Sequence, residues 1–172
     1  QYRNNLLEAV KGLSEQPLTV EVNNEENIAR IIYQNGQFSL PTDSAEEFPQ
    51  AQPIGDNATV ITIANDLLVD NINRSIFATG QDELRPVMNG IYFDLTQECL
   101  AIVGTDGHKL VRNKVFTINS DVPASFILPK KPAMLLKNVL QKDGSEVTIR
   151  FDERNAEINY SDGVITCRLI EG

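Results

Sequence analysis

The sequence predicts an α+β fold in which one unit, a strand followed by a helix and three further strands, occurs more than once. Three observations support this prediction. Short runs of apolar residues are separated by turn signals, which is typical of antiparallel strands. Three longer segments carry apolar residues at helical spacing. The same order of elements recurs in residues 58–118 and 125–170, and residues 3–40 repeat it without the leading strand.

The first part of the chain is expected to form a helix and a three-stranded sheet. The helix is predicted over residues 3–13, where the apolar positions are Leu6, Leu7, Val10 and Leu13. Strands follow at residues 18–22, 28–33 and 37–40, and Asn35-Gly36 between the last two is a strong hairpin signal. Residues 41–56 hold three prolines and four acidic residues, which predicts an extended linker.

The middle of the chain repeats this order with a strand in front. A strand at Thr59–Ile63 is followed by a helix that Asn65 or Asp66 would cap and that runs to about Ala78. Gly80 to Pro86 is a polar loop. Three strands are then predicted at residues 88–95, 100–105 and 109–118, and Asp106-Gly107 forms the second of their two turns.

The last part of the chain gives the third copy. A short strand at residues 125–128 precedes a helix whose first turn accepts Pro132 and which Asp143-Gly144 ends. The apolar face of this helix holds Met134, Leu135, Leu136, Val139 and Leu140. Three strands complete the copy at residues 147–151, 156–160 and 164–169, the last two joined by Asp162-Gly163.

The first copy lacks its leading strand, so we expect the chain to begin inside a domain whose earlier part lies outside it. A domain that simply opens with a helix is the alternative interpretation. Paired copies would place sheets on the outside and two helices on one side. Repetition of such a pair around an axis gives a closed ring that is lined with helices.

Composition limits the class of protein. The 172 residues are 41% hydrophobic, which suits one or two small domains with real cores. The sequence has no apolar run long enough for a transmembrane helix and no signal-peptide pattern. Cys99 and Cys167 lie in strand-like runs and are expected to be buried free thiols, as is typical of a reducing cytosol. We therefore expect a cytoplasmic location and no membrane attachment.

The net charge of −9 argues against a protein that grips nucleic acid by neutralising phosphates. The acidic excess is uneven, however. Residues 1–63 carry three bases against nine acids, and residues 64–172 carry twelve bases against fifteen acids. The bases of the second part cluster in residues 109–114 and 130–142. A protein that merely surrounds DNA needs only a modestly basic inner wall.

Two sequence strings carry a specific resemblance. FATGQDELRPVMNGIYFDL at residues 77–95 and TDGHKLVR at residues 105–112 resemble the second domain of the bacterial sliding clamp, the beta subunit of DNA polymerase III. QFSLPTDSAEEFP at residues 37–49 resembles the end of the first clamp domain. The resemblance implies the DNA-clamp fold, with residues 1–50 as the second half of domain 1, residues 51–55 as a linker and residues 56–172 as domain 2.

The resemblance also implies a function. Clamps of this family are rings of two chains that encircle double-stranded DNA and perform no chemistry themselves. They hold the DNA polymerase III alpha subunit, the clamp loader and other proteins with a clamp-binding motif in a hydrophobic pocket between domains 2 and 3. The resemblance therefore implies a replication processivity factor without cofactor or metal. The domain 2 side of the pocket matches Met88, Thr105, Gly107, His108, Lys109 and Leu110.

Further positions match surfaces that the family uses around DNA and at the ring closure. Phe38 and Leu40 match the edge strand by which the first domain meets the partner chain. Pro86 and Val87 stand where relatives can carry aromatic residues, so base stacking is not expected here. The DNA-facing positions implied by the resemblance and by helical geometry are Arg74, Arg85, Pro86, Val87, Lys130, Lys131 and Lys137.

Two rival interpretations come from the residues alone. Thr105-Asp106-Gly107-His108 could supply a metal ligand or a base, but the chain has one histidine and lacks a nucleophile elbow and a Walker loop. An acidic, β-rich interaction or carbohydrate-binding module is the second rival. The free cysteines and the missing signal-peptide pattern count against it. Without the family, Lys130 and Lys131 would be an ordinary solvated helix start.

Overall fold

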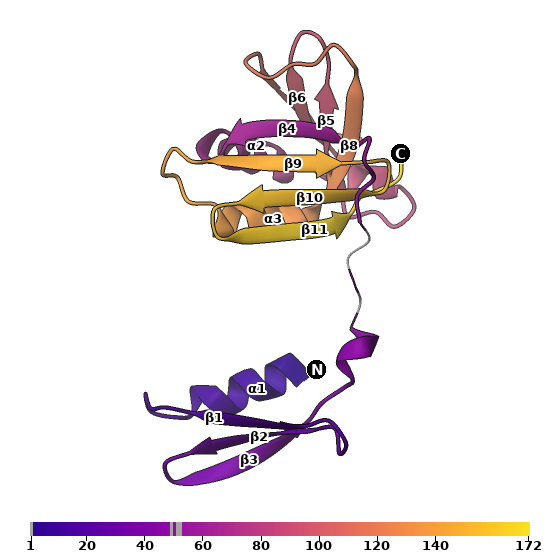
Figure 1. The fold of residues 1–172 in the computed structure, drawn as a ribbon. Coiled ribbons are helices and arrows are strands. Elements are labelled where there is room, and N and C mark those ends of the chain that lie inside the picture. Colours follow the sequence, from indigo (N-terminus) through magenta and orange to yellow (C-terminus); the bar gives the residue numbers. More distant parts are fainter. Residues whose placement is uncertain (1, 49, 51–52) are drawn as a thin grey trace. The chain divides into compact units, whose positions relative to one another are not determined.

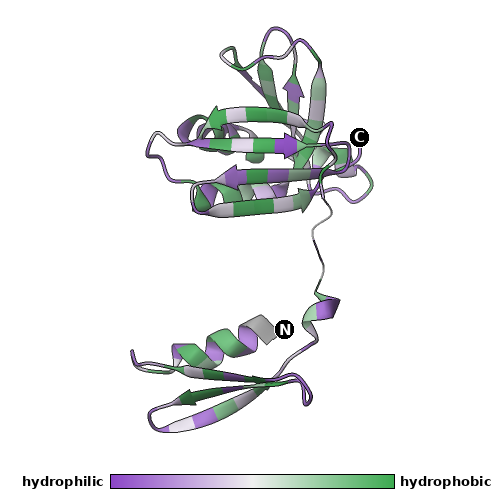
Figure 2. Cartoon of the chain, in the orientation of Figure 1, coloured by the Kyte–Doolittle hydropathy of each residue, from purple (hydrophilic) through white to green (hydrophobic). Residues whose placement is uncertain are grey.

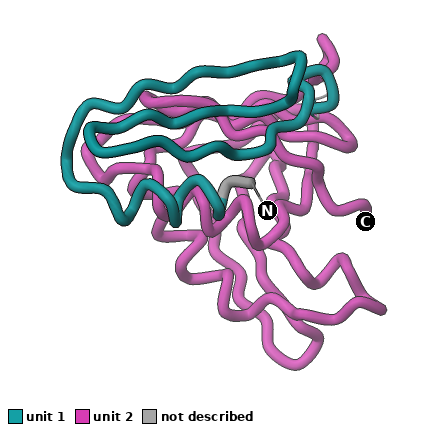
Figure 3. The backbone as a smooth tube through the Cα atoms, turned by 90° about the horizontal axis from the view of Figure 1, so that it is seen from below, with its two compact units in different colours: residues 1–50 teal, residues 51–172 magenta. Residues whose placement is uncertain are grey.

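The computed structural model describes residues 2–48, 50 and 53–172, and the chain divides into two compact units, residues 1–50 and 51–172 (Figure 3). In its described residues the first unit holds one α-helix, one short 3-10 helix and one antiparallel sheet in the order β1-β2-β3 (Figure 1). Its elements are α1 (Tyr2–Lys11), β1 (Thr19–Asn23), β2 (Ile28–Tyr33), β3 (Gly36–Pro41) and the short 3-10 helix η1 (Ala45–Glu47).

The sheet of the first unit has one apolar face. In its register, Val20 lies opposite Ile31 and Ile31 lies opposite Phe38, so these three side chains point to the same side. Of the side chains described in this unit, only Ile31 is a buried hydrophobic residue, whereas Val20 and Val22 on β1 are 59% and 61% exposed. The apolar face is therefore only partly covered in this unit.

The second unit holds two helices and two four-stranded antiparallel sheets in its described residues (Figure 1). Its first half contains β4 (Thr59–Ala64), α2 (Asn65–Ile76), the 3-10 turn η2 (Pro86–Met88), β5 (Gly90–Leu95), β6 (Leu100–Thr105) and β7 (Leu110–Val115). Its second half contains β8 (Ala124–Pro129), α3 (Lys130–Val139), β9 (Glu146–Phe151), β10 (Asn155–Tyr160) and β11 (Gly163–Arg168). The predicted α+β class and the order of elements are confirmed.

The two halves of the second unit exchange their leading strands. One sheet runs β11-β10-β9-β4 and the other runs β7-β6-β5-β8. Strand β4 precedes α2 in the chain but pairs with β9, and β8 precedes α3 but pairs with β5. Each half thus completes the sheet of the other, so neither half can fold independently into its observed form.

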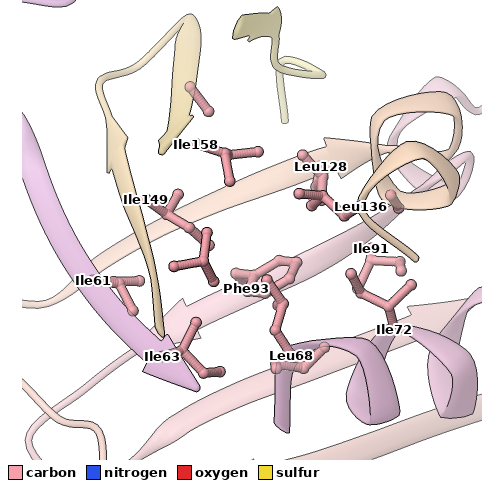
Figure 4. Packing of buried hydrophobic residues seen from close by; sticks show 14 of the residues in the cluster. Ile61, Ile63, Leu68, Ile72, Ile91, Phe93, Leu128, Leu136, Ile149 and Ile158 are labelled. Carbon is pink, nitrogen blue, oxygen red and sulfur yellow. The ribbon is translucent and has the colours of Figure 1, made fainter. Parts of the chain in front are cut away.

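The core of the second unit lies between the two sheets and the two helices. Figure 4 shows side chains from β4, β5, β8, β9, β10, α2 and α3 meeting in one cluster. Phe126 on β8 stacks on Phe93 of β5, with ring centroids 4.7 Å apart, and lies 4.4 Å from Phe151 of β9. Because the ring of Phe126 contacts both sheets, it joins the two halves. Hydrophobic residues recur along the strands of both units (Figure 2).

Several local predictions are wrong. Ala64 is the N-cap of α2, and α2 ends at Ile76 rather than near Ala78. The side-chain amide of Asn65 instead donates to the Gln141 carbonyl at 3.1 Å and to Ser145 Oγ at 2.6 Å. This side chain therefore ties the start of α2 to the loop after α3. Its partners are distant in sequence, and it does not cap the helix locally.

Two further segments differ from prediction. Met88 lies in the 3-10 turn η2, and the strand begins only at Gly90. The predicted extended linker over residues 41–56 contains η1, where Ser44 Oγ accepts the Glu46 N–H at 3.3 Å, so the prediction is wrong there. Residues 49, 51 and 52 of that segment lie outside the described residues.

Both cysteines are free thiols, as predicted, but only one is fully buried. Cys99 is buried, and Cys167 on β11 is half-buried. Burial raises the pKa of the Cys167 thiol to about 11, because the thiolate would lose its hydration. This thiol therefore stays protonated at neutral pH and is a poor nucleophile.

Candidate functional site

The turn between β6 and β7 carries five of the six predicted pocket residues. Thr105 Oγ1 donates to the Lys109 carbonyl at 2.8 Å and accepts the Gly107 N–H at 3.1 Å. Asp106 accepts the N–H groups of His108 at 3.0 Å and Lys109 at 2.9 Å. Gly107 has a φ of +86°, which favours glycine. The turn is thus fixed by its own side chains.

The Asp106 carboxylate is the charged centre of this turn. It also accepts a hydrogen bond from the Lys109 ammonium group. That bond and the two backbone N–H groups hold the pKa of Asp106 well below its usual range. The carboxylate therefore stays ionised at neutral pH, which makes it a structural acceptor rather than a general base in this turn.

The sixth predicted pocket residue, Met88, belongs to another segment, η2, and its side chain lies beside this turn. A Cβ atom placed on Gly107 would lie 3.6 Å from Met88 Sδ and 2.9 Å from a guanidinium nitrogen of Arg85. Arg85 Nε in turn donates to Asp82 at 2.8 Å. The structure thus brings Met88 and Gly107 together, and it adds Arg85, which sequence reasoning placed only at the DNA.

The surface of this site is open. Leu110 pairs with Thr105 at the start of β7, and its side chain is 65% exposed. His108 and Lys109 are also exposed, whereas Met88 is partly buried. The site therefore offers one exposed aliphatic side chain, one adaptable thioether and a polar turn, which is a chemistry suited to one wall of a peptide site.

The loop of residues 80–89 carries three of the predicted DNA-facing residues. The side chain of Asn89 closes this loop: its Oδ1 accepts the Asp82 N–H at 2.9 Å and its Nδ2 donates to the Asp82 carbonyl at 2.9 Å. Pro86 is exposed, and Val87 lies against Gly172, whose added Cβ atom would be 3.0 Å from Val87 Cγ1. Sequence reasoning missed the Asn89 contacts, since nothing in the local pattern distinguishes them.

The basic residues on the helices differ in their surroundings. Arg74 near the end of α2 and Lys131 on α3 are exposed, and Lys137 near the end of α3 is partly buried. None of these three cations forms an ion pair with the residues that the structure describes. The Lys130 ammonium group donates to the Gly80 carbonyl at 2.9 Å. Helices α2 and α3 contact each other, so these cations lie on one pair of helices.

Phe38 and Leu40 lie on β3, which is the last strand in the β1-β2-β3 order. Both side chains are partly buried on the apolar face of the sheet, and the Phe38 ring lies 6.2 Å from that of Tyr33.

Within residues 2–48, 50 and 53–172, no group of histidine, cysteine and acidic residues is arranged to hold a metal ion. No described helix is long and apolar enough to cross a membrane.

Comparison with known proteins places these features in a family. The model of the DNA polymerase III beta subunit, central domain, matches residues 62–172. The chain is 26% identical to the beta sliding clamp of Buchnera aphidicola over 94% of its own length and 43% of that protein. It is 27% identical to the beta sliding clamp of Bacillus subtilis over 96% of its length and 43% of that protein. The chain thus spans less than half the length of these relatives.

Solved structures give the same result. The DNA polymerase sliding clamp of Bacillus subtilis matches with a TM-score of 0.85 and 26% identity, covering 98% of this chain and 44% of that one. The DNA polymerase III subunit beta of Pseudomonas aeruginosa matches with a TM-score of 0.84 and 25% identity, covering 98% and 46%. These likenesses confirm the predicted clamp fold.

Proposed function

Because the chain belongs to the DNA polymerase III beta subunit family, we propose that it forms part of a ring-shaped sliding clamp that encircles duplex DNA during replication. The single observation that carries this proposal is the likeness of nearly the whole chain, in sequence and in structure, to sliding clamps. The clamp would act as a processivity factor, holding DNA polymerase on its template by topology. Two complete clamp chains, each longer than this one, would close the ring.

We assign residues 1–50 to the second half of a first clamp domain, residues 51–55 to a linker and residues 56–172 to the central domain. The internal repeat supports this assignment. Tyr33 and Tyr160 occupy equivalent hairpins, and their hydroxyl oxygens would lie 2.9 Å and 3.2 Å from Cβ atoms placed on Gly36 and Gly163. Strand β1 corresponds to β9, but among the described strands it has no partner equivalent to β4, which pairs with β9.

The DNA would run past α2 and α3. Arg74, Lys131 and Lys137 support this proposal, since they are cations on two adjacent helices without ion pairs among the described residues. Arg85, Pro86 and Val87 would approach the DNA from the loop before β5. A few unpaired cations suit a wall that DNA slides along, because tight neutralisation of phosphates would oppose movement. Phe38 and Leu40 would lie at the contact that closes the ring.

The turn at residues 105–110 and Met88 would form half of a peptide pocket. The partners would be the DNA polymerase III alpha subunit, the clamp loader and other proteins that carry a short apolar clamp-binding motif. The open surface around Leu110 supports a half-site, because one exposed wall buries too little of a peptide for tight binding. The other wall would come from a third domain.

The protein would perform no chemistry, need no cofactor and act in the cytoplasm with the replication machinery. The sequence suggested a catalytic alternative around Asp106 and His108, but the Asp106 carboxylate is occupied by its own turn. Neither the family match nor the structural likenesses favour the carbohydrate-binding alternative.

Calorimetry with a short peptide that carries glutamine followed by leucine and phenylalanine tests the pocket. We expect no measurable binding to this chain and binding to a version extended through a third domain. In the extended protein, His108→Ala combined with Leu110→Ala should weaken binding at least about tenfold, because both side chains would contact the peptide. Unchanged affinity would remove these residues from the site.

Retention on DNA tests the ring. The complete clamp, placed on circular duplex DNA by its loader, should remain bound at high salt and be released when the DNA is cut. This chain alone should not be retained on either form. Tight, salt-sensitive binding of this chain to linear duplex would contradict a topological mechanism.

A further inference from the structure

Lys130 and Lys131 are neighbours of equal charge at the start of α3, but the structure gives them different surroundings. Lys131 is exposed, whereas Lys130 is partly buried and donates to the Gly80 carbonyl at 2.9 Å. Two cations in the first turn of a helix oppose the helix dipole, and α3 has no acidic residue there to offset them. The hydrogen bond to the Gly80 carbonyl offsets the unfavourable helix dipole for Lys130, whereas Lys131 has no such acceptor among the described residues.

Gly80 is a buried junction between the end of α2 and the loop that follows. Its N–H donates to the Met88 carbonyl at 2.7 Å, and its carbonyl accepts from Lys130. A Cβ atom placed on Gly80 would lie 3.5 Å from Met88 Cβ, so the two residues are in close contact. Removal of the Lys130 ammonium group would leave the buried Gly80 carbonyl without its partner.

A chain of contacts then leads from Lys130 to the candidate pocket. The Lys130 ammonium group donates to the Gly80 carbonyl, Gly80 contacts Met88, and Met88 Sδ would lie 3.6 Å from a Cβ atom placed on Gly107. We propose that Lys130 is a positioning residue, which holds the loop of residues 80–89 against α3 and so sets Met88 beside the Gly107 turn. Lys131, by contrast, is the cation of the pair that remains available to phosphate. The effect on peptide binding rests on the proposed function, whereas the effect on the loop does not.

Amide hydrogen exchange of this chain tests the loop directly. Lys130→Met should speed exchange at the Gly80 amide, which donates to Met88, and at the Asp82 amide, which donates to Asn89, by about tenfold. Lys131→Met removes the same charge from the same helix turn and should leave both amides unchanged. Lys130→Arg keeps a donor and should restore slow exchange. The Ile158 amide in β10 serves as an internal reference for intact folding.

Peptide affinity of the version extended through a third domain tests the consequence. Lys130→Met should weaken the glutamine–leucine–phenylalanine peptide about fivefold to tenfold, and Lys131→Met should change it less than twofold. Equal exchange at Gly80 in the two methionine variants would overturn the positioning role. Faster exchange with unchanged affinity would overturn the link to Met88. If the unsubstituted extended protein binds no peptide, the proposed pocket fails, while the exchange data still decide the role of Lys130.

Discussion

Each unit of the chain contains a helix followed by three antiparallel strands, but the corresponding strands differ in how deeply they are buried. In residues 51–172, β9 pairs with both β10 and β4, and its Ile149 side chain is 1% exposed. In residues 1–50, the corresponding β1 pairs with β2 alone among the described strands, and all five of its residues are exposed. The same local pattern therefore gives a buried strand in one unit and an exposed strand in the other.

The difference shows that the repeat is not a folding unit by itself. In the second unit, each copy of the repeat receives a fourth strand from the other copy, because β4 and β8 are exchanged. The other copy also contributes a second helix. Among the described residues of the first unit, the sheet is covered by α1 without a second α-helix or a fourth strand, and Leu6 and Leu7 on α1 stay 42% and 45% exposed. Two layers need enough apolar area between them, and a segment of about fifty residues is marginal in this respect.

The largest expected effect of this difference is in hydrogen exchange. The Ile31 amide on β2 and the Ile158 amide on β10 occupy equivalent places, and both side chains are buried. We expect the Ile158 amide to exchange at least about a thousandfold more slowly, because its opening requires unfolding of a complete core. Native-state exchange followed by NMR measures both sites in one sample.

The control for this comparison is a protein that contains the complete first domain of the proposed clamp. There the Ile31 amide should approach the protection of Ile158, because a fourth strand would cover β1. Equal protection of the two sites in this chain alone would mean that residues 1–50 are already completed by another contact, such as a second copy. A concentration series would then reveal that contact.

A matched pair of substitutions gives the next largest effect. Ile149→Ala removes a side chain from the core between the sheets and should lower the free energy of unfolding of the second unit by about 2–5 kcal/mol. Val20→Ala changes the equivalent position of β1, where 59% of the side chain is exposed, and should cost less than about 1 kcal/mol. Urea unfolding curves measure the first effect, and Ile31 exchange measures the second. A large effect of Val20→Ala would show that β1 is covered in solution.

The sequence was sufficient to predict the order of elements, because apolar spacing and turn residues such as Asp162-Gly163 are local signals. It did not predict that β4 and β8 change sheets. In the sequence, both strands have the ordinary alternating pattern of a strand. Their pairing partners depend instead on long-range packing of residues such as Phe126. The predicted cap at Asn65 failed for the same reason, since Gln141 and Ser145 offered partners to its side chain.

The candidate site also contains one part that the sequence predicts and one part that it does not. The turn at residues 105–110 could be located from its own sequence, because Asp106 and Gly107 determine its geometry locally. The approach of Met88 and Arg85 to Gly107 could not be derived, since it depends on the loop that Asn89 and Lys130 hold. Sequence proximity also made Lys130 and Lys131 look equivalent, although only one of them contacts a carbonyl among the described residues.

The smallest expected effect concerns two equivalent turns. In the turn after β9, Asp152 accepts the N–H groups of Arg154 at 2.8 Å and Asn155 at 2.7 Å. In the turn after β1, the neutral Asn23 accepts those of Glu25 at 3.0 Å and Glu26 at 3.2 Å. The backbone N–H groups, that of Arg154 foremost, lower the pKa of Asp152 below its ordinary value of 3.8. Of the two acceptors, Asp152 and Asn23, only the Asp152 carboxylate is therefore expected to gain a proton in acid.

Asp152→Asn would give this turn the acceptor found in the first unit. Because the pKa of Asp152 is lowered by folding, its stabilisation is complete above the ordinary value and is lost as the pH falls through the lowered value. At pH 7 the variant should be less stable than the original by under about 1 kcal/mol, and the difference should shrink towards pH 2. Urea unfolding at several pH values measures this. A constant difference across that range would mean that the carboxylate charge contributes nothing and that the two turns are physically alike.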